Sequence, residues 1–112
     1  MRFENLDVWQ KSVDLSCTIY LIMKNNRDFG FKDQICRSAV SVASNIAEGY
    51  ERIHKKETIN FLSIAKGSIG ELKTQIIIGA RVGYISSPAH LIKECELIAR
   101  MLGSLIQKLK HS

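Results

Sequence analysis

Apolar residues recur along this chain at spacings of three and four, which is the period of one face of an α-helix. Four such stretches follow one another, over about residues 6–25, 32–53, 55–82 and 88–110. No segment shows the strict apolar–polar alternation that is typical of a half-buried strand. The pattern therefore predicts an all-α chain of four helices, each of roughly 20 residues and about 30 Å long.

Three of the predicted helices carry one regular apolar stripe, which we expect to face a shared core. The stripe of the second helix comprises Ile35, Ala39, Val42, Ile46, Gly49 and Ile53. That of the third comprises Leu62, Ala65, Ile69, Leu72, Ile76 and Gly79, and that of the fourth comprises Leu91, Cys95, Ile98, Leu102, Leu105 and Leu109. The first helix has two apolar sets on nearly opposite faces, one with Trp9 and Tyr20 and the other with Leu15 and Ile19.

The connections between the stretches are short and carry residues that begin or end helices. Gly30 ends a polar loop over residues 25–30 and is the expected backbone hinge. Ser87 is a suitable N-cap, and Pro88 suits the first helical position. Long helices with short loops predict a single domain over residues 1–112, folded as an antiparallel up-down-up-down four-helix bundle.

The first three helices carry more apolar surface than one bundle needs. The outer side of the third helix has Ile64 and Ile78 where charged residues would be expected, together with Gly67 and Gly70. Each glycine costs about 1 kcal/mol of helix stability relative to alanine, so a close contact at these positions is expected. Wide stripes and some outward apolar residues are normal in bundles. We nevertheless favour a second buried surface, and hence a homo-oligomer, because large exposed apolar patches are unfavourable.

Composition is typical of a folded domain rather than a disordered segment, with 46% hydrophobic and 24% charged residues among 112. A signal peptide is not expected, and no run reaches the eighteen or so apolar residues that a membrane span needs. The three cysteines, Cys17, Cys36 and Cys95, are far apart and odd in number. We therefore expect free thiols and a cytoplasmic protein.

The net charge of +5 lies in the second half of the chain. The third helix has five basic residues against two acidic ones, and the fourth has four against two. Lys66 and Lys73 are seven residues apart, as are Lys93 and Arg100, and this spacing suits a phosphate backbone. The alternative is that these side chains only solubilise the bundle. No aromatic residue is interleaved with them, so backbone and shape contacts are expected rather than base stacking.

Catalytic chemistry and cofactors are not expected. Glu51 and His54 form a Glu-x-x-His motif, which is half of the ligand set of di-iron helical bundles, but no second motif follows. Gly67 and Gly70 fall inside a predicted helix, so they form no phosphate-binding loop. Cys95 belongs to an apolar stripe, which is unfavourable for a nucleophile. A metal-dependent enzyme is therefore the least favoured class.

Four polar residues stand within otherwise apolar helices, namely Asn45 and Glu48 in the second and Glu71 and Gln75 in the third. Their spacing presents each pair to one side, so they are candidates for an interhelical hydrogen-bond network that fixes register. Two alternatives remain open: the two glutamates point to solvent, or the four residues contact a ligand.

Two long motifs make the chain resemble a known bacterial family. They are QICRSAVSVASNIAEG over residues 34–49 and FLSIAKGSIGELKTQ over residues 61–75, with a shorter match, GYI, over residues 83–85. The family comprises four-helix-bundle proteins encoded in intervening sequences of large-subunit ribosomal RNA genes. The chain departs from its pattern at Ala43, where proline is common, and at His54, where serine usually caps the third helix.

The resemblance implies a homopentameric ring, and a fold similar to that of accessory proteins of diversity-generating retroelements, which associate with a reverse transcriptase and nucleic acid. We therefore expect a non-enzymatic homo-oligomer that binds RNA or a ribonucleoprotein. The candidate contact residues are Lys66, Lys73, Arg81, Lys93 and Arg100. The alternative is a protein-binding scaffold that docks a partner enzyme, such as a nucleic-acid-processing protein, without touching nucleic acid.

Overall fold

A computed structural model describes residues 2–112 of the chain. A 3₁₀ turn, η1 (Phe3–Asn5), precedes four helices: α1 (Asp7–Met23), α2 (Phe29–Tyr50), α3 (Lys55–Arg81) and α4 (Ala89–Lys110). No strand occurs in this part of the chain. The prediction of an all-α protein with four helices is confirmed.

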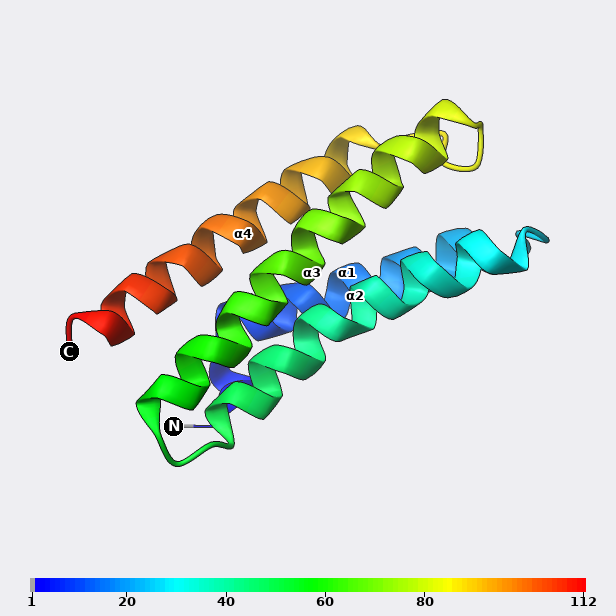
Figure 1. Cartoon of the computed structure of the whole chain (residues 1–112). Coiled ribbons are helices and arrows are strands. Elements are labelled where there is room, and N and C mark those ends of the chain that lie inside the picture. The colour runs from blue at the N-terminus through cyan, green and yellow to red at the C-terminus, as the bar shows by residue number, and fades with distance from the viewer. Residues whose placement is uncertain (1) are drawn as a thin grey trace.

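The helices form two antiparallel hairpins, α1–α2 and α3–α4, which lie against each other (Figure 1). Each helix contacts two neighbours, and the most extensive contact joins α2 to α3. Both chain ends and the α2–α3 connection lie at one end of the bundle, and the other two connections lie at the opposite end. The bundle therefore runs up-down-up-down, with extents of 45 × 20 × 20 Å.

The core contains the predicted stripes with changes at the ends of α2 and α4. All six stripe residues of α3 are buried. Near the end of α4 Ile106 is buried, whereas Leu105 and Leu109 are only partly buried. Ile53 lies beyond the end of α2 and is 93% exposed, so its predicted place in the core is wrong. The helix ends at Tyr50 in a tightened last turn, in which the N–H of Glu51 is shared between the carbonyl groups of Ala47 and Glu48 and that of Arg52 bonds to Gly49 at 3.3 Å.

The face of α1 with Leu15 and Ile19 enters the core, and of the other set Met23 is buried and Trp9 packs partly against the core. Leu15 and Ile19 are buried, whereas Tyr20 is 51% exposed. Two serines on the buried side allow close approach of α2, because their hydroxyl groups donate to backbone oxygens. Ser12 bonds within α1, to the carbonyl of Val8 at 2.7 Å, and Ser16 reaches the carbonyl of Ala39 at 2.8 Å.

The start of α2 differs from the prediction at Gly30. Asp28 caps the helix by accepting a hydrogen bond from the backbone N–H of Phe31 at 3.2 Å, so the helix begins at Phe29 and Gly30 lies in its first turn. The positive φ angle that requires glycine occurs instead at Gly83, between α3 and α4, with a φ of 86°.

Asp28 also ties the two connections at this end of the bundle together. Its second carboxylate oxygen accepts a hydrogen bond from the hydroxyl of Tyr84 at 2.8 Å, and the Tyr84 ring meets Phe31 edge to face. These two hydrogen bonds, that from Tyr84 foremost, lower the pKa of Asp28. At the start of α4 the N-cap is Pro88, one residue later than predicted.

Within residues 2–112, no helix has both the length and the apolarity to cross a membrane.

Candidate nucleic-acid interface and surface grooves

Two of the five predicted basic residues lie where α3 meets α4. Lys73 of α3 forms an ion pair with Glu96 of α4 at 3.0 Å, so its charge is partly balanced. Lys66 lies two turns earlier on α3, and its side chain extends toward α4. The ammonium nitrogen of Lys66 would lie 3.6 Å from a β-carbon added to Gly103. The sequence predicted both lysines as contact residues. Their neighbours on α4 differ, because Glu96 lies beside Lys73 and Gly103 lies beside Lys66.

Lys66 lines an open groove of about 390 Å³, here called the α3–α4 groove. The groove is lined by Ser63, Lys66, Gly67, Gly103, Ile106, Gln107 and Lys110. None of these residues is acidic, and the two lysines are exposed. The groove therefore offers two cations, a hydroxyl and an amide around a floor that two glycines leave open.

Lys110, Ser63 and Gln107 were not among the predicted contact residues. Their signal in the sequence is weak, because Lys66 and Lys110 are far apart in the chain and adjacent only through the packing of α3 on α4. The glycines at 67 and 103, one on each helix, are the feature that could have pointed to an open floor.

The other three predicted residues lie elsewhere. Arg81 is exposed at the end of α3, and Lys93 is exposed in the first turns of α4. Arg100 is also exposed but lines a groove on the α1 side of α4. Within residues 2–112, none of these three side chains forms an ion pair. The structure thus spreads the five residues along two helices instead of gathering them at one point.

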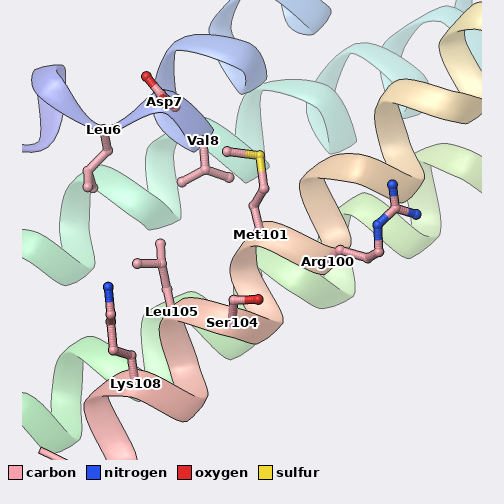
Figure 2. Close-up of a pocket in the computed structure, with 8 residues that line it drawn as sticks. All are labelled: Leu6, Asp7, Val8, Arg100, Met101, Ser104, Leu105 and Lys108. Atoms are coloured by element: carbon pink, nitrogen blue, oxygen red, sulfur yellow. The ribbon is translucent and has the colours of Figure 1, made fainter.

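The groove beside Arg100, here called the α1–α4 groove, has a volume of about 520 Å³. It is lined by Leu6, Asp7, Val8, Arg100, Met101, Ser104, Leu105 and Lys108. Figure 2 shows Met101 and Leu105 extending from α4 toward Val8 and Leu6. Arg100 and Lys108 stand at opposite ends of the row on α4.

The predicted polar network runs through serines rather than directly among its four members. Ser38 of α2 donates to Glu71 of α3 at 2.9 Å. Asn45 bonds to Ser41, whose hydroxyl meets that of Ser68 on α3 at 2.9 Å. These contacts link α2 to α3 and favour a role in helix register.

The two remaining members of the set are placed differently. Glu48 pairs with Arg52 at 3.2 Å on the surface, as one of the alternatives anticipated. The side-chain oxygen of Gln75 is buried and has no hydrogen-bond partner among the described residues. Gln75 lines a shallow polar groove of about 300 Å³ with Glu71, Ser38 and Ser41.

Besides the α1–α4 groove, two further apolar surfaces among residues 2–112 face solvent. Residues of α1 and α2 line the α1–α2 groove of about 500 Å³, namely Val13, Ser16, Cys17, Tyr20, Leu21, Val40, Ala43 and Ser44. Leu21 is 72% exposed there. On the outer side of α3, Ile64 and Ile78 are 45% and 48% exposed, and nothing lies within 4 Å of a β-carbon added to Gly67 or Gly70. The close contact expected at these glycines is thus not made among residues 2–112.

Candidate metal ligands and nucleophiles are not brought together. Glu51 and His54 lie in the connection between α2 and α3. Within residues 2–112, no group of three or more His, Cys, Asp or Glu side chains could hold a metal ion. Burial raises the pKa of the Cys95 thiol to about 12, and it also raises the pKa of Cys36. Both thiols are therefore poor nucleophiles near neutral pH.

The fold defines the class of protein as an all-α four-helix bundle whose surface carries open grooves. Comparison with known proteins gives the family: the sequence model of the 23S rRNA-intervening sequence proteins matches residues 4–104. The chain belongs to this family. No curated protein matches it.

A solved structure supports the same assignment. The crystal structure of a protein with unknown function from the S23 ribosomal protein family of Bacteroides thetaiotaomicron is similar, with a TM-score of 0.82 and 26% sequence identity. The match covers 88% of this chain and 97% of that one. The recognition of the family from its two sequence motifs is confirmed.

Proposed function

We propose that this protein is a non-enzymatic homo-oligomer that binds RNA, free or within a ribonucleoprotein, through the basic surface of α3 and α4. The observation that carries the proposal is the α3–α4 groove, in which Lys66 and Lys110 stand over an open glycine floor with no carboxylate among the lining residues. The cytoplasm is the proposed location, because Cys17, Cys36 and Cys95 are all free thiols.

The chemistry of the groove suits a phosphodiester backbone. Lysine ammonium groups neutralise phosphates as point charges, and the amide of Gln107 adds a neutral donor, whereas the hydroxyl of Ser63 already donates to the carbonyl of Ile59 at 3.0 Å. Lys73 contributes less in the free protein, because Glu96 already pairs with it. Without aromatic side chains in the groove, contacts to backbone and shape are expected to dominate.

Membership in a family described by 23S rRNA intervening sequences supports an RNA partner. The location of the whole +5 net charge in the second half of the chain supports the choice of α3 and α4 as the contact surface.

Fluorescence anisotropy with a labelled RNA hairpin, near 50 mM salt, tests the proposal. We expect the double variant Lys66→Gln/Lys110→Gln to bind roughly tenfold more weakly than the wild type and to lose about 2 from its salt slope. The control is Lys11→Gln/Lys24→Gln, which removes the same charge from α1 and its C-cap. Equal affinities of the two double variants would contradict the assignment of the surface.

The oligomer is proposed from the two apolar surfaces. The α1–α2 groove and the outer side of α3 belong to different elements, so one copy can offer its α3 to the groove of the next. Such a head-to-tail contact closes into a ring when the rotation between copies permits it. The family resemblance gives five as the proposed number of copies. A ring would also repeat the basic surface and strengthen its potential.

Light scattering tests the oligomer. The wild type should have a molar mass several times the 12.6 kDa of one chain, and five times for a pentamer. Tyr20→Glu/Leu21→Glu should reduce the mass to that of the monomer, because it places two charges in the apolar groove. Ile53→Glu is the matched control, because Ile53 is 93% exposed and lines neither surface. A wild-type mass of 12.6 kDa would contradict the oligomer.

A protein-binding scaffold is the second candidate function, and the α1–α2 groove favours it because a partner protein could cover the same apolar residues. The RNA titration discriminates between the two functions. Binding of a partner enzyme by a wild type that shows no affinity for RNA near 50 mM salt would support the scaffold.

A further inference from the structure

We propose that the α1–α4 groove is a binding site for a single-chain amphiphile with an anionic head group, such as a medium-chain fatty carboxylate. The inference goes beyond RNA binding and concerns a different side of α4, the side that faces α1.

The floor of the groove is apolar because α1 and α4 leave a space between them. These two helices make the least extensive contact of the four neighbouring pairs. Val8 is buried at the bottom, and Leu6, Met101 and Leu105 are only partly covered. A volume of about 520 Å³ lies within the usual range of small-molecule sites, which are also mostly apolar with a few polar groups.

The polar groups at the edge of the groove favour an anion. Arg100 and Lys108 are exposed, and neither forms an ion pair within residues 2–112. Asp7 is the acidic lining residue, and Figure 2 shows its carboxylate pointing away from α4. The groove therefore presents two cations to a ligand, and charge complementarity selects a negative head group.

The spacing of the cations favours a ligand with an extended chain. Arg100 and Lys108 are eight helical residues apart, which corresponds to about 12 Å along α4. Met101 and Leu105 fill the interval between them (Figure 2). One cation can pair with the head group while the alkyl chain covers this apolar row. A nucleic-acid backbone would leave the same row exposed to water, so the site differs in chemistry from the α3–α4 groove.

The NMR signals of methionine methyl groups report directly on ligand binding in this groove. Met101 lines the groove, whereas Met23 is fully buried at the opposite end of α1 and acts as an internal control. In protein labelled with ¹³C at the methionine methyl groups, decanoate below its micelle concentration should shift the Met101 resonance saturably and leave Met23 in place. Lengthening the alkyl chain should tighten binding by up to about fourfold per methylene.

Head-group charge is tested with ligands of equal chain length. Decyltrimethylammonium should bind at least roughly tenfold more weakly than decanoate, because Arg100 and Lys108 repel it. Decyl phosphate, titrated in parallel, distinguishes a phosphate from a carboxylate head group, and saturable binding of either anion supports the site.

Variants complete the test. Arg100→Gln/Lys108→Gln should weaken decanoate binding by about fourfold to 25-fold, at roughly two- to fivefold for each exposed charge. Lys93→Gln/Lys110→Gln removes the same charge from α4 outside the groove and should leave binding unchanged. An unmoved Met101 resonance, equal affinity for both signs of head group, or an unaffected Arg100/Lys108 variant would overturn the proposal. If a second copy fills the groove instead, decanoate leaves Met101 unmoved and the Arg100/Lys108 variant changes the molar mass, which also overturns it.

Discussion

Gly49 and Gly67 both lie inside helices, but their surroundings are opposite. A β-carbon on Gly49 would meet the Phe61 β-carbon at 3.0 Å and the Thr58 carbonyl oxygen at 3.3 Å. The hydroxyl of Thr58 also donates to the Gly49 carbonyl at 2.8 Å, so α2 and α3 touch here through their backbones. Around Gly67 the space is empty.

This contrast gives a prediction for two identical substitutions. Gly49→Ala should destabilise the protein by about 1–3 kcal/mol, because the backbone of α3 has to move. Gly67→Ala should stabilise the isolated chain by up to about 1 kcal/mol, through helix propensity. Urea unfolding of the two variants, in the monomeric Tyr20→Glu/Leu21→Glu background, measures both values. Equal effects would contradict the difference in packing.

The cysteines allow a second residue-scale prediction. At pH 8 a thiol with a pKa of about 12 is ionised in roughly one molecule in ten thousand, so Cys95 should react negligibly with a disulfide reagent in the folded protein. Cys36 is also buried and should be protected. Cys17 is exposed on the single chain and lines the α1–α2 groove.

Thiol counting in the Tyr20→Glu/Leu21→Glu variant should therefore give one fast thiol per chain, and the wild-type oligomer should protect it. All three thiols should react after unfolding. Two or more fast thiols in the folded variant would contradict the burial of Cys36 and Cys95.

At the scale of elements, α2 owes its start to Asp28. Asp28→Ala should lower the melting temperature by a few degrees at pH 7, because α2 loses its N-cap and Tyr84 loses its acceptor. The pKa of Asp28 is lowered in the folded state, so its contribution is present above the unfolded value of about 4 and is lost as pH falls through the folded value. Thermal melts by circular dichroism should show the difference between variant and wild type narrowing below about pH 4. A difference that stays constant down to pH 2 would contradict this role.

Periodicity predicted α3 best because its stripe is unbroken from Leu62 to Gly79 and every residue of it is buried. It could not decide which apolar face of α1 is buried, because both sets, the one with Trp9 and Tyr20 and the one with Leu15 and Ile19, follow helical spacing. That choice depends on tertiary contact, through the bond from Ser16 to Ala39. Ile53 continues the apolar spacing of α2 beyond Tyr50, where the helix ends. The pattern therefore predicted a helix that is longer than the one observed.

The candidate site was predictable only in part. Local sequence identified Lys66 as a basic position, but its neighbours Gly103 and Lys110 come from another helix and depend on the register of α3 against α4. The same register pairs Lys73 with Glu96, which no spacing along one helix could reveal. The fold therefore separates basic residues that the sequence grouped: Lys66 lies in the α3–α4 groove, and Arg100 lies in the α1–α4 groove on another side of α4.

At the scale of the whole molecule, the bundle has a division of surfaces that suits an oligomeric RNA-binding protein. The apolar α1–α2 groove and the outer side of α3 are available for contact between copies, and the α3–α4 groove carries free lysines. One chain offers only a few of these cations, so strong binding to RNA is expected to depend on several copies acting together.

The salt dependence of RNA affinity tests the central claim most directly. For the wild type and a structured RNA, we predict measurable binding near 50 mM salt and a linear fall of log K with log[salt], with a slope steeper than about −2, since more than one chain supplies cations. The Lys66→Gln/Lys110→Gln variant should show a shallower slope. No binding near 50 mM salt, or an affinity that does not change as salt is raised, would contradict the account.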